Sequence, residues 1–210
     1  AKGGVVLCHG HPGTRMETLD RAKWLYEAGF HVLLFDFRAL GRSEGTVSGI
    51  GCYEVQDLLG AVDILLARAE MASLPLGVYG HSMGGAVSLL TAAQDPRIEA
   101  VATHGAYATL ESAIRQRAKL LAHGFAPTFE ESVTRYGKQW LPIDPKALAP
   151  QEAIAKIAPR PLLLFHGAKD KIIALEDAYT LYEAAGEPKQ LHILTHSYHI
   201  GIHPSEQEKY

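Results

Sequence analysis

The sequence predicts an α/β domain with a mostly parallel sheet of about six strands and helices on both faces. Short, continuous apolar runs recur along the chain, as in strands that are buried on both faces. Segments with apolar residues at helical spacing separate most of these runs, and this alternation is typical of parallel sheets. The 210 residues are 47% hydrophobic and 20% charged, a balance that suits one globular domain with a sizeable core.

Strand and helix alternate regularly over the first half of the chain. Apolar runs predict four strands, at residues 4–8, 31–36, 76–81 and 97–103. Helical spacing predicts three helices between them, at residues 17–28, 53–69 and 83–94. Gly29 is a usual C-terminal stop signal for the first of these helices. The spaced apolar positions of that helix are Leu19, Ala22, Leu25 and Tyr26.

The alternation is interrupted between residues 105 and 159. It resumes with strands at 161–165 and 190–194 and a helix at 175–185. Within the interruption, helices are predicted at 110–122 and from Thr128, where Thr128 and Glu131 have the spacing of a capping box. We interpret residues 1–210 as a single domain that carries a lid or cap insertion at 105–159. The alternative is that the insertion is only extra packing.

Aromatic residues of the insertion are candidates for a substrate-binding wall. Phe129 and Trp140 would suit contact with an acyl chain. The same side chains equally suit packing of the insertion onto the body of the domain, and both interpretations stay open here.

A Gly-x-Ser-x-Gly motif occupies residues 80–84, within the run GHSMGG (80–85), at the end of a predicted strand and the start of a predicted helix. A turn this tight holds its central residue in a strained backbone conformation with the hydroxyl exposed. The flanking Gly80 and Gly84 let neighbouring backbone pass without a clash at Cβ. Ser82 is therefore the predicted nucleophile.

Four short motifs resemble those of the α/β-hydrolase family and occur in the family's order. Together they span nearly the whole chain. Residues 80–85 resemble its nucleophile elbow, residues 9–13 (HGHPG) its oxyanion loop, and residues 166–170 (HGAKD) its acid loop. Residues 36–43 (DFRALGRS) are similar to a loop common among its esterase-like members. The resemblance implies a serine hydrolase with this fold, lacking the two further strands with which the family's sheet usually begins.

The resemblance also implies a Ser-His-Asp triad, whose members follow in the order serine, acid, histidine on loops at the carboxyl ends of strands. A serine hydroxyl needs an imidazole base, and a carboxylate holds that base in place. Asp170, five residues past Phe165, is the predicted acid, with a role in a turn or a helix cap as the alternative. His199 is the predicted base because the loop after the last strand gives it slack to reach Ser82. His196, where that strand stops, is the alternative base.

Two backbone N–H groups are predicted to hold the oxyanion, those of His11 and Met83. Met83 begins a helix whose dipole adds partial positive charge. Pro12 has no N–H to donate, which favours His11 as the other donor. His104 ends a strand beside the elbow and is a candidate for substrate binding. A structural histidine hydrogen-bonded to backbone is the alternative at that position.

The C-terminal segment is rich in histidine. On a helix these residues would share one face, a pattern that suggests a metal site. The segment instead follows a helix stop, where the sheet still needs its last strand, and no carboxylate or thiol is interleaved. We therefore expect no metal and no other cofactor. The histidines concerned are His192, His196, His199 and His203.

Composition bears on partners and location. The formal net charge of −3 gives no electrostatic basis for binding nucleic acid or an anionic membrane. No apolar stretch reaches the about 18 residues that a membrane span needs, and no leader pattern opens the chain, so we expect a cytoplasmic protein. Without the family's first two strands, residues 31–35 would form the edge of the sheet. A long apolar edge invites pairing, so we expect a homodimer, or aggregation, through it.

The favoured interpretation is a carboxylesterase that cleaves a small-molecule ester through an acyl-enzyme on Ser82. The same groups cleave thioesters and acylated peptides, so a thioesterase and an acyl-aminopeptidase are alternatives within the class. A non-catalytic binding protein of this fold, and a metal-dependent hydrolase built on the C-terminal histidines, are the alternatives from other classes.

Overall fold

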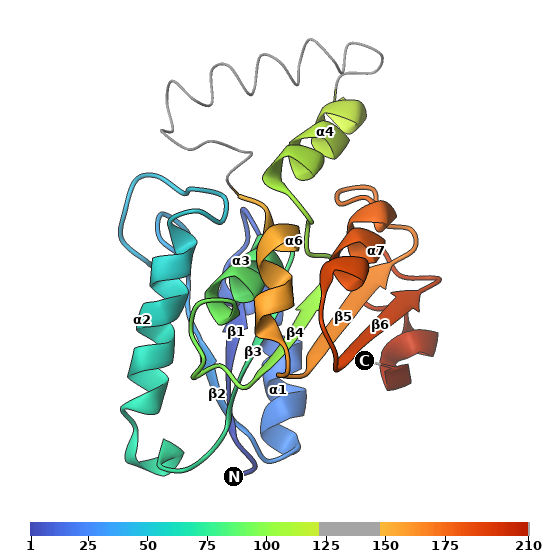
Figure 1. The fold of residues 1–210 in the computed structure, drawn as a ribbon. Coiled ribbons are helices and arrows are strands. Elements are labelled where there is room, and N and C mark those ends of the chain that lie inside the picture. The colour runs from blue at the N-terminus through green and yellow to red at the C-terminus, as the bar shows by residue number, and fades with distance from the viewer. Residues whose placement is uncertain (122–147, 210) are drawn as a thin grey trace.

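The computed structural model describes residues 1–121 and 148–209. A six-stranded sheet runs through these residues in the order β2-β1-β3-β4-β5-β6, and every neighbouring pair is parallel (Figure 1). The α/β class predicted from the sequence is therefore confirmed. The strands are β1 (Gly4–Cys8), β2 (His31–Leu34), β3 (Leu76–His81), β4 (Ala100–His104), β5 (Leu162–Gly167) and β6 (Lys189–Leu194).

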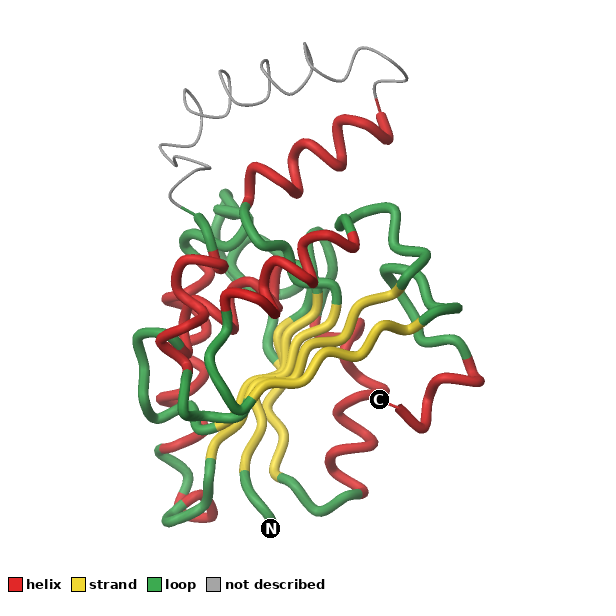
Figure 2. Tube along the Cα trace, turned by 45° about the vertical axis from the view of Figure 1, so that its right-hand side comes forward, coloured by secondary structure: helices red, strands yellow, loops and turns green. Residues whose placement is uncertain are grey.

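Helices lie on both faces of this sheet (Figures 1 and 2). Helices α2, α3, α6 and α7 cover one face, and α1 lies on the other. The α-helices are α1 (Leu19–Glu27), α2 (Glu54–Leu66), α3 (Met83–Ala92), α4 (Leu110–Leu121), α6 (Pro150–Ala153) and α7 (Leu175–Ala184). Short 3-10 helices are η1 (Arg15–Thr18), η2 (Ala69–Met71), η4 (Ile154–Ile157) and η5 (Pro204–Lys209).

Strand β1 is buried on both of its faces, as its continuous apolar sequence predicts. Val6 and Cys8 belong to the larger core, which also contains Leu58 of α2 and Val87 of α3. Leu7 points to the opposite face and joins a smaller cluster under α1. Successive side chains of a strand alternate between faces, so a strand with helices on both sides must be apolar throughout.

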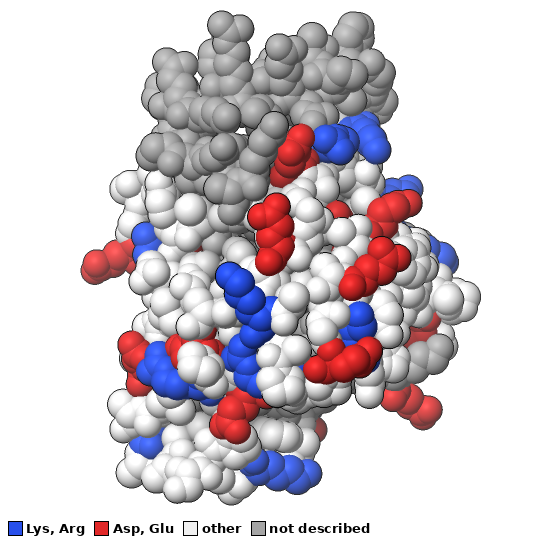
Figure 3. Space-filling view, viewed as in Figure 1, with Lys and Arg blue, Asp and Glu red and all other residues white. Residues whose placement is uncertain are grey.

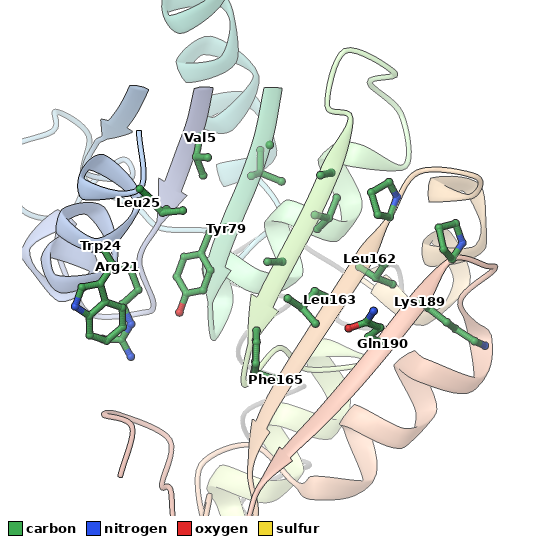
Figure 4. A pocket seen from close by; sticks show the side chains of 18 of the residues that line it. Val5, Arg21, Trp24, Leu25, Tyr79, Leu162, Leu163, Phe165, Lys189 and Gln190 are labelled. Atoms are coloured by element: carbon green, nitrogen blue, oxygen red, sulfur yellow. The ribbon is translucent and has the colours of Figure 1, made fainter. Parts of the chain in front are cut away.

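Helix α1 buries less of itself than its sequence predicts. Ala22 is buried, but Leu19 and Tyr26 are 47% and 71% exposed, so their helical spacing does not mark the packed face. Beside α1, a cleft of about 780 Å³ opens on this face of the sheet (Figure 4). Trp24 and Tyr79 line it, and the candidate nucleophile, acid and base do not.

Strand β2 lies at the edge of the sheet, where the sequence placed it. Among the described residues it pairs with β1 alone. The homodimer or aggregate through this edge stays a prediction.

Charged side chains are mixed on the surface. Acidic and basic groups are interspersed over the face that carries α2, α6 and α7 (Figure 3). Within the described part of the chain, every helix is too short or too polar to cross a membrane.

The insertion is described in part. Helix α4 begins six residues after β4 ends and extends away from the carboxyl edge of the sheet (Figure 1). Its Ser112 hydroxyl donates to Asp177 of α7 at 3.1 Å, and its Gln116 amide donates to the carbonyl of Lys171 at 3.2 Å. The second predicted helix, from Thr128, lies outside the described residues. So do Phe129 and Trp140, and the lid interpretation therefore stays a proposal.

Candidate active site

The turn between β3 and α3 holds Ser82 at φ 54° and ψ −119°, a conformation that residues with side chains rarely adopt. Strain of this kind costs on the order of 1–3 kcal/mol and persists only where the surroundings fix it. A Cβ added to Gly80 would lie 2.2 Å from the carbonyl oxygen of Gly84. One added to Gly84 would lie 2.4 Å from the carbonyl oxygen of Cys8. Both glycines are therefore required for this close approach of backbones.

A hydrogen-bonded relay joins Ser82, His199 and Asp170, which come from three distant parts of the chain. The Ser82 Oγ lies 2.9 Å from His199 Nε2. Nδ1 of the same ring lies 2.6 Å from Asp170 Oδ2. Because an ionised carboxylate only accepts hydrogen bonds, Nδ1 carries the ring proton and Nε2 accepts the hydroxyl proton. The residues predicted as nucleophile, base and acid are thus adjacent.

His196, the alternative base, lies away from this relay. Its side chain is exposed, and its ring packs against that of His203 at a centroid distance of 5.5 Å. Strand β6 ends at Leu194, and the turn that follows it carries His199 back to Ser82.

Asp170 is fixed from both of its carboxylate oxygens. While Oδ2 faces His199, Oδ1 accepts hydrogen bonds from the N–H groups of Ile172 and Ile173 at 2.8 and 3.0 Å. These bonds stabilise a turn and do not cap a helix, because α7 begins at Leu175 and its N-cap is Ala174. Burial alone would raise the pKa of Asp170, but the hydrogen bonds from His199 and Ile173 outweigh it and hold this pKa below its usual value. The acid stays ionised beside the base.

Glu206, a residue not singled out from the sequence, anchors the loop that carries His199. Its carboxylate accepts hydrogen bonds from the hydroxyls of Thr195 and Ser197 at 3.0 and 2.7 Å, and from the N–H of His196 at 3.2 Å. Removal of this carboxylate from water opposes ionisation, but these donors outweigh that effect and lower the pKa of Glu206 to about 2. No sequence motif marks the residue, because its partners lie about ten positions earlier.

The HGHPG loop lies against the elbow. A Cβ added to Gly10 would lie 3.1 Å from the Cβ of Ser82. The buried His9 ring donates from Nδ1 to the carbonyl of Gly10 at 2.7 Å, and its Nε2 accepts the N–H of Phe37 at 3.0 Å. One neutral tautomer of His9 thus joins this loop to the end of β2.

The two predicted oxyanion donors have N–H groups free for a ligand. Met83 is the first residue of α3, so its N–H has no acceptor within the helix. The N–H of His11, one residue past Gly10, donates to no other group of the described residues. The relay of Ser82, His199 and Asp170 thus lies next to the HGHPG loop and the first turn of α3, where the two N–H groups are predicted to act.

His104 is fully buried, with 0% of its surface exposed. Burial lowers its pKa well below the ordinary value, and the charge on the neighbouring His81 lowers it further. The two rings pack edge to face with centroids 5.4 Å apart. Of the two roles considered for His104, burial fits the structural one.

The four C-terminal histidines do not share a helix, since His192 lies in β6 and the others lie in the loop beyond it. In the described ranges, we find no group of three or more histidine, cysteine, aspartate or glutamate side chains arranged to hold a metal ion.

The chain is similar in sequence to one described family and to several bacterial proteins. A family model described as serine aminopeptidase, S33, matches residues 1–149. The protein YfhR of Escherichia coli K12 is 30% identical over 201 residues, which cover 93% of this chain and 62% of YfhR. YqkD of Bacillus subtilis is 27% identical, over 98% of this chain and 68% of its own. The chain thus spans less than two thirds of the length of the first of these relatives.

Two solved esterase structures resemble the whole fold. The Pyrococcus furiosus esterase Pf2001 superposes with a TM-score of 0.76 at 22% identity, over 100% of this chain and 78% of its own. The esterase domain of a Rhodothermus marinus protein superposes with a TM-score of 0.64 at 26% identity, over 94% of this chain and 77% of its own.

Proposed function

Because the chain belongs to the serine aminopeptidase (S33) family of α/β-hydrolases, we propose that it is a serine hydrolase that cleaves carboxylic esters through an acyl-enzyme on Ser82. The observation that carries this proposal is the relay from Ser82 Oγ through His199 to Asp170, at 2.9 and 2.6 Å. The esterases among the structural relatives support the choice of ester over other acyl substrates.

The first half of the proposed reaction forms the acyl-enzyme. His199 Nε2 takes the hydroxyl proton of Ser82 while Oγ bonds to the carbonyl carbon of the ester. The carbonyl oxygen becomes an oxyanion, which accepts hydrogen bonds from the N–H groups of His11 and Met83. The C–O bond to the alcohol then breaks, and His199 gives its proton to the leaving alcohol oxygen.

The second half regenerates the enzyme. A water molecule gives a proton to His199 and bonds through its oxygen to the acyl carbon. The bond to Ser82 Oγ breaks, the serine takes the proton back, and the carboxylic acid leaves. Throughout, the ionised Asp170 holds the imidazole in one tautomer and stabilises its positive charge. The steps use only groups of the chain and water.

A second candidate is cleavage of an amide bond at the N-terminus of a peptide. The description of the matching family as a serine aminopeptidase favours it. The same relay serves both reactions, because His199 can protonate a leaving amine as well as a leaving alcohol. A thioesterase differs only in the leaving thiol.

We further propose that the insertion at 105–159 sets substrate size within a single domain of residues 1–210. Its first helix, α4, leaves the same edge of the sheet that carries Ser82, and Gln116 contacts the Asp170 loop at Lys171. Alanine at Phe129 or Trp140 should shift acyl-length preference while small esters are still cleaved. A folded variant with unchanged preference would leave the insertion as packing.

The experiment that tests the proposal combines labelling with a substrate panel. A fluorophosphonate probe should label the protein once, at Ser82, as located by peptide mass spectrometry. Nitrophenyl esters of graded acyl length should then be turned over faster than matched thioesters and aminoacyl anilides. Faster anilide cleavage would favour the aminopeptidase. Absence of both labelling and turnover would leave a binding protein of this fold.

A further inference from the structure

A second imidazole–carboxylate pair lies beside the relay. The residues are His81, which immediately precedes Ser82, and Glu17 of η1. His81 Nδ1 contacts Glu17 Oε1 in a short hydrogen bond, and His81 Nε2 lies 2.7 Å from the backbone carbonyl oxygen of His199. The exposed fractions of the His81 and Glu17 side chains are only 8% and 20%.

The partners of His81 determine its protonation. A carbonyl oxygen only accepts, so Nε2 must carry a proton. Glu17 Oε1 also accepts a hydrogen bond from the N–H of Gly10 at 3.0 Å, as an ionised carboxylate oxygen can. Burial raises the pKa of Glu17, but the hydrogen bonds from His81 and Gly10 and the nearby imidazole charge together outweigh burial and keep this pKa below its usual value. An ionised Glu17 requires a proton on Nδ1 as well. His81 is therefore an imidazolium, whereas His9 is neutral.

The pair joins three separate segments of the candidate site. Glu17 holds the HGHPG loop through the N–H of Gly10, one residue before the predicted oxyanion donor His11. His81 belongs to the elbow itself. Through Nε2 it also holds the backbone of the base, and its ring lies 4.8 Å from the ring of His199.

We propose that Glu17 and His81 are positioning residues, which hold the oxyanion loop and the base loop onto the elbow through a charged pair. The proposal rests on the serine-hydrolase function above. Neither residue touches the reacting atoms. Glutamine at position 17 would keep an oxygen that can accept from both Gly10 and His81, but it would lack the negative charge that holds the second proton on the His81 ring.

Few other charged groups face this pair. Arg21 of α1 lines a crevice of about 20 Å³ together with Glu17 and His81, the volume of roughly one water. The neutral His104 packs against His81 from β4, and His199 packs against it from the base loop. When His199 becomes charged during turnover, two imidazolium rings are neighbours, and Glu17 offsets the second charge.

The first test is ¹⁵N NMR of the histidine side chains of the whole chain at pH 8, where an unperturbed histidine is neutral. The His81→Gln variant identifies the signals. We expect both ring nitrogens of His81 to be of the protonated type. One unprotonated nitrogen on His81 would overturn the charged pair, whatever the protein hydrolyses. This measurement needs no activity, so its failure is distinct from failure of the proposed function.

The second test is the Glu17→Gln variant, with Glu70→Gln as the control. Glu70 is exposed beside Arg68, so Glu70→Gln removes the same charge at a position outside the candidate site. At pH 8 we expect kcat of Glu17→Gln to fall roughly ten- to a hundredfold with KM changed less than about threefold, since small displacements of catalytic groups cost this much. The rate of phosphonate labelling of Ser82 should fall in proportion.

The pH profile separates positioning from a merely structural role. Lowering the pH from 8 to 6 recharges His81 in Glu17→Gln, so the ratio of wild-type to variant kcat should shrink, while the ratio for Glu70→Gln stays at one. A ratio independent of pH, or an unchanged kcat, would overturn the proposal. If Glu17→Gln does not fold, the NMR result on the wild type decides. Two protonated nitrogens in a protein without ester turnover would overturn the proposed function alone.

Discussion

The two ends of helix α3 differ in whether their backbone groups have hydrogen-bond partners within the protein. At its start, the N–H of Met83 has no acceptor within the helix and follows the strained Ser82, where we propose that it binds the oxyanion. At its end, the guanidinium of Arg160 donates to the carbonyls of Ala92, Asp95 and Ile98 at 2.7, 3.0 and 2.7 Å. A cation at a helix C-terminus also complements the helix dipole.

The difference separates function from stability along a single helix. Groups that serve a transient charge must be held in place without a permanent partner, whereas groups with no such task are satisfied within the protein. Changes at the start of α3 should therefore reduce turnover, and changes at its end should reduce the free energy of unfolding.

The largest effect is expected at the start. Ser82→Ala should lower turnover of a good ester by roughly 10⁵- to 10⁶-fold, because it removes the proposed nucleophile. The free energy of unfolding should stay within about 1 kcal/mol of wild type. Kinetics and denaturant titration of the same sample measure both. An active Ser82→Ala variant would remove this residue as nucleophile.

A similar loss is expected for the base. His199→Ala should lower turnover by roughly 10⁴- to 10⁶-fold, while His196→Ala, its matched control, should leave kcat unchanged. The side chain of His196 is exposed, and its ring packs against that of His203. The reverse result would move the base to His196 and contradict the relay.

The end of α3 should show the opposite pattern. Arg160→Ala leaves several carbonyl groups without their donor, and the free energy of unfolding should fall by about 2–4 kcal/mol. The kcat of the folded fraction should be unchanged. Arg160→Lys should recover only part of the loss, because a single ammonium cannot reach all the carbonyls. A lower kcat of Arg160→Ala with an unchanged free energy of unfolding would contradict the assignment of this end of α3 to stability.

The smallest effect is a pH dependence at the same end. The hydrogen bonds from Arg97 lower the pKa of Asp95 below its ordinary 3.8. Stability from a lowered pKa is present above the unfolded value and is lost as the pH falls through the folded one. The free energy of unfolding, measured by denaturant titration between pH 6 and pH 2, should therefore fall less steeply as the pH falls for Asp95→Asn than for wild type. Equal pH dependence of the free energy of unfolding in the two proteins would show that ionised Asp95 does not stabilise the fold.

Much of the fold and the relay could be predicted from sequence because their signals are local. Apolar runs placed all six strands to within a few residues, and the GHSMGG motif located the turn at Ser82. His199 followed from where the last strand stops. The edge position of β2 in the described sheet agrees with the strand order that the family resemblance implies.

Other features could not be predicted, because they depend on which segments pack together. Glu17 and His81 are 64 positions apart, and Arg160 contacts Ala92 across 68. Helical spacing showed that α1 has apolar positions, but it does not tell which of them the sheet covers. Tyr26 is therefore exposed where Ala22 is buried. The burial of His104 depends in the same way on the helices around it.

The close approach of backbones at Gly80 and Gly84 limits how this protein can be altered in the laboratory. Any side chain at either position meets a carbonyl oxygen at under 2.5 Å, and backbone cannot move aside as a side chain can. Libraries that seek new substrates should keep both codons fixed and vary the insertion instead. Gly60 of α2, where an added Cβ meets nothing within 4 Å, is the contrary case: alanine there should raise stability by about 1 kcal/mol and offset losses elsewhere.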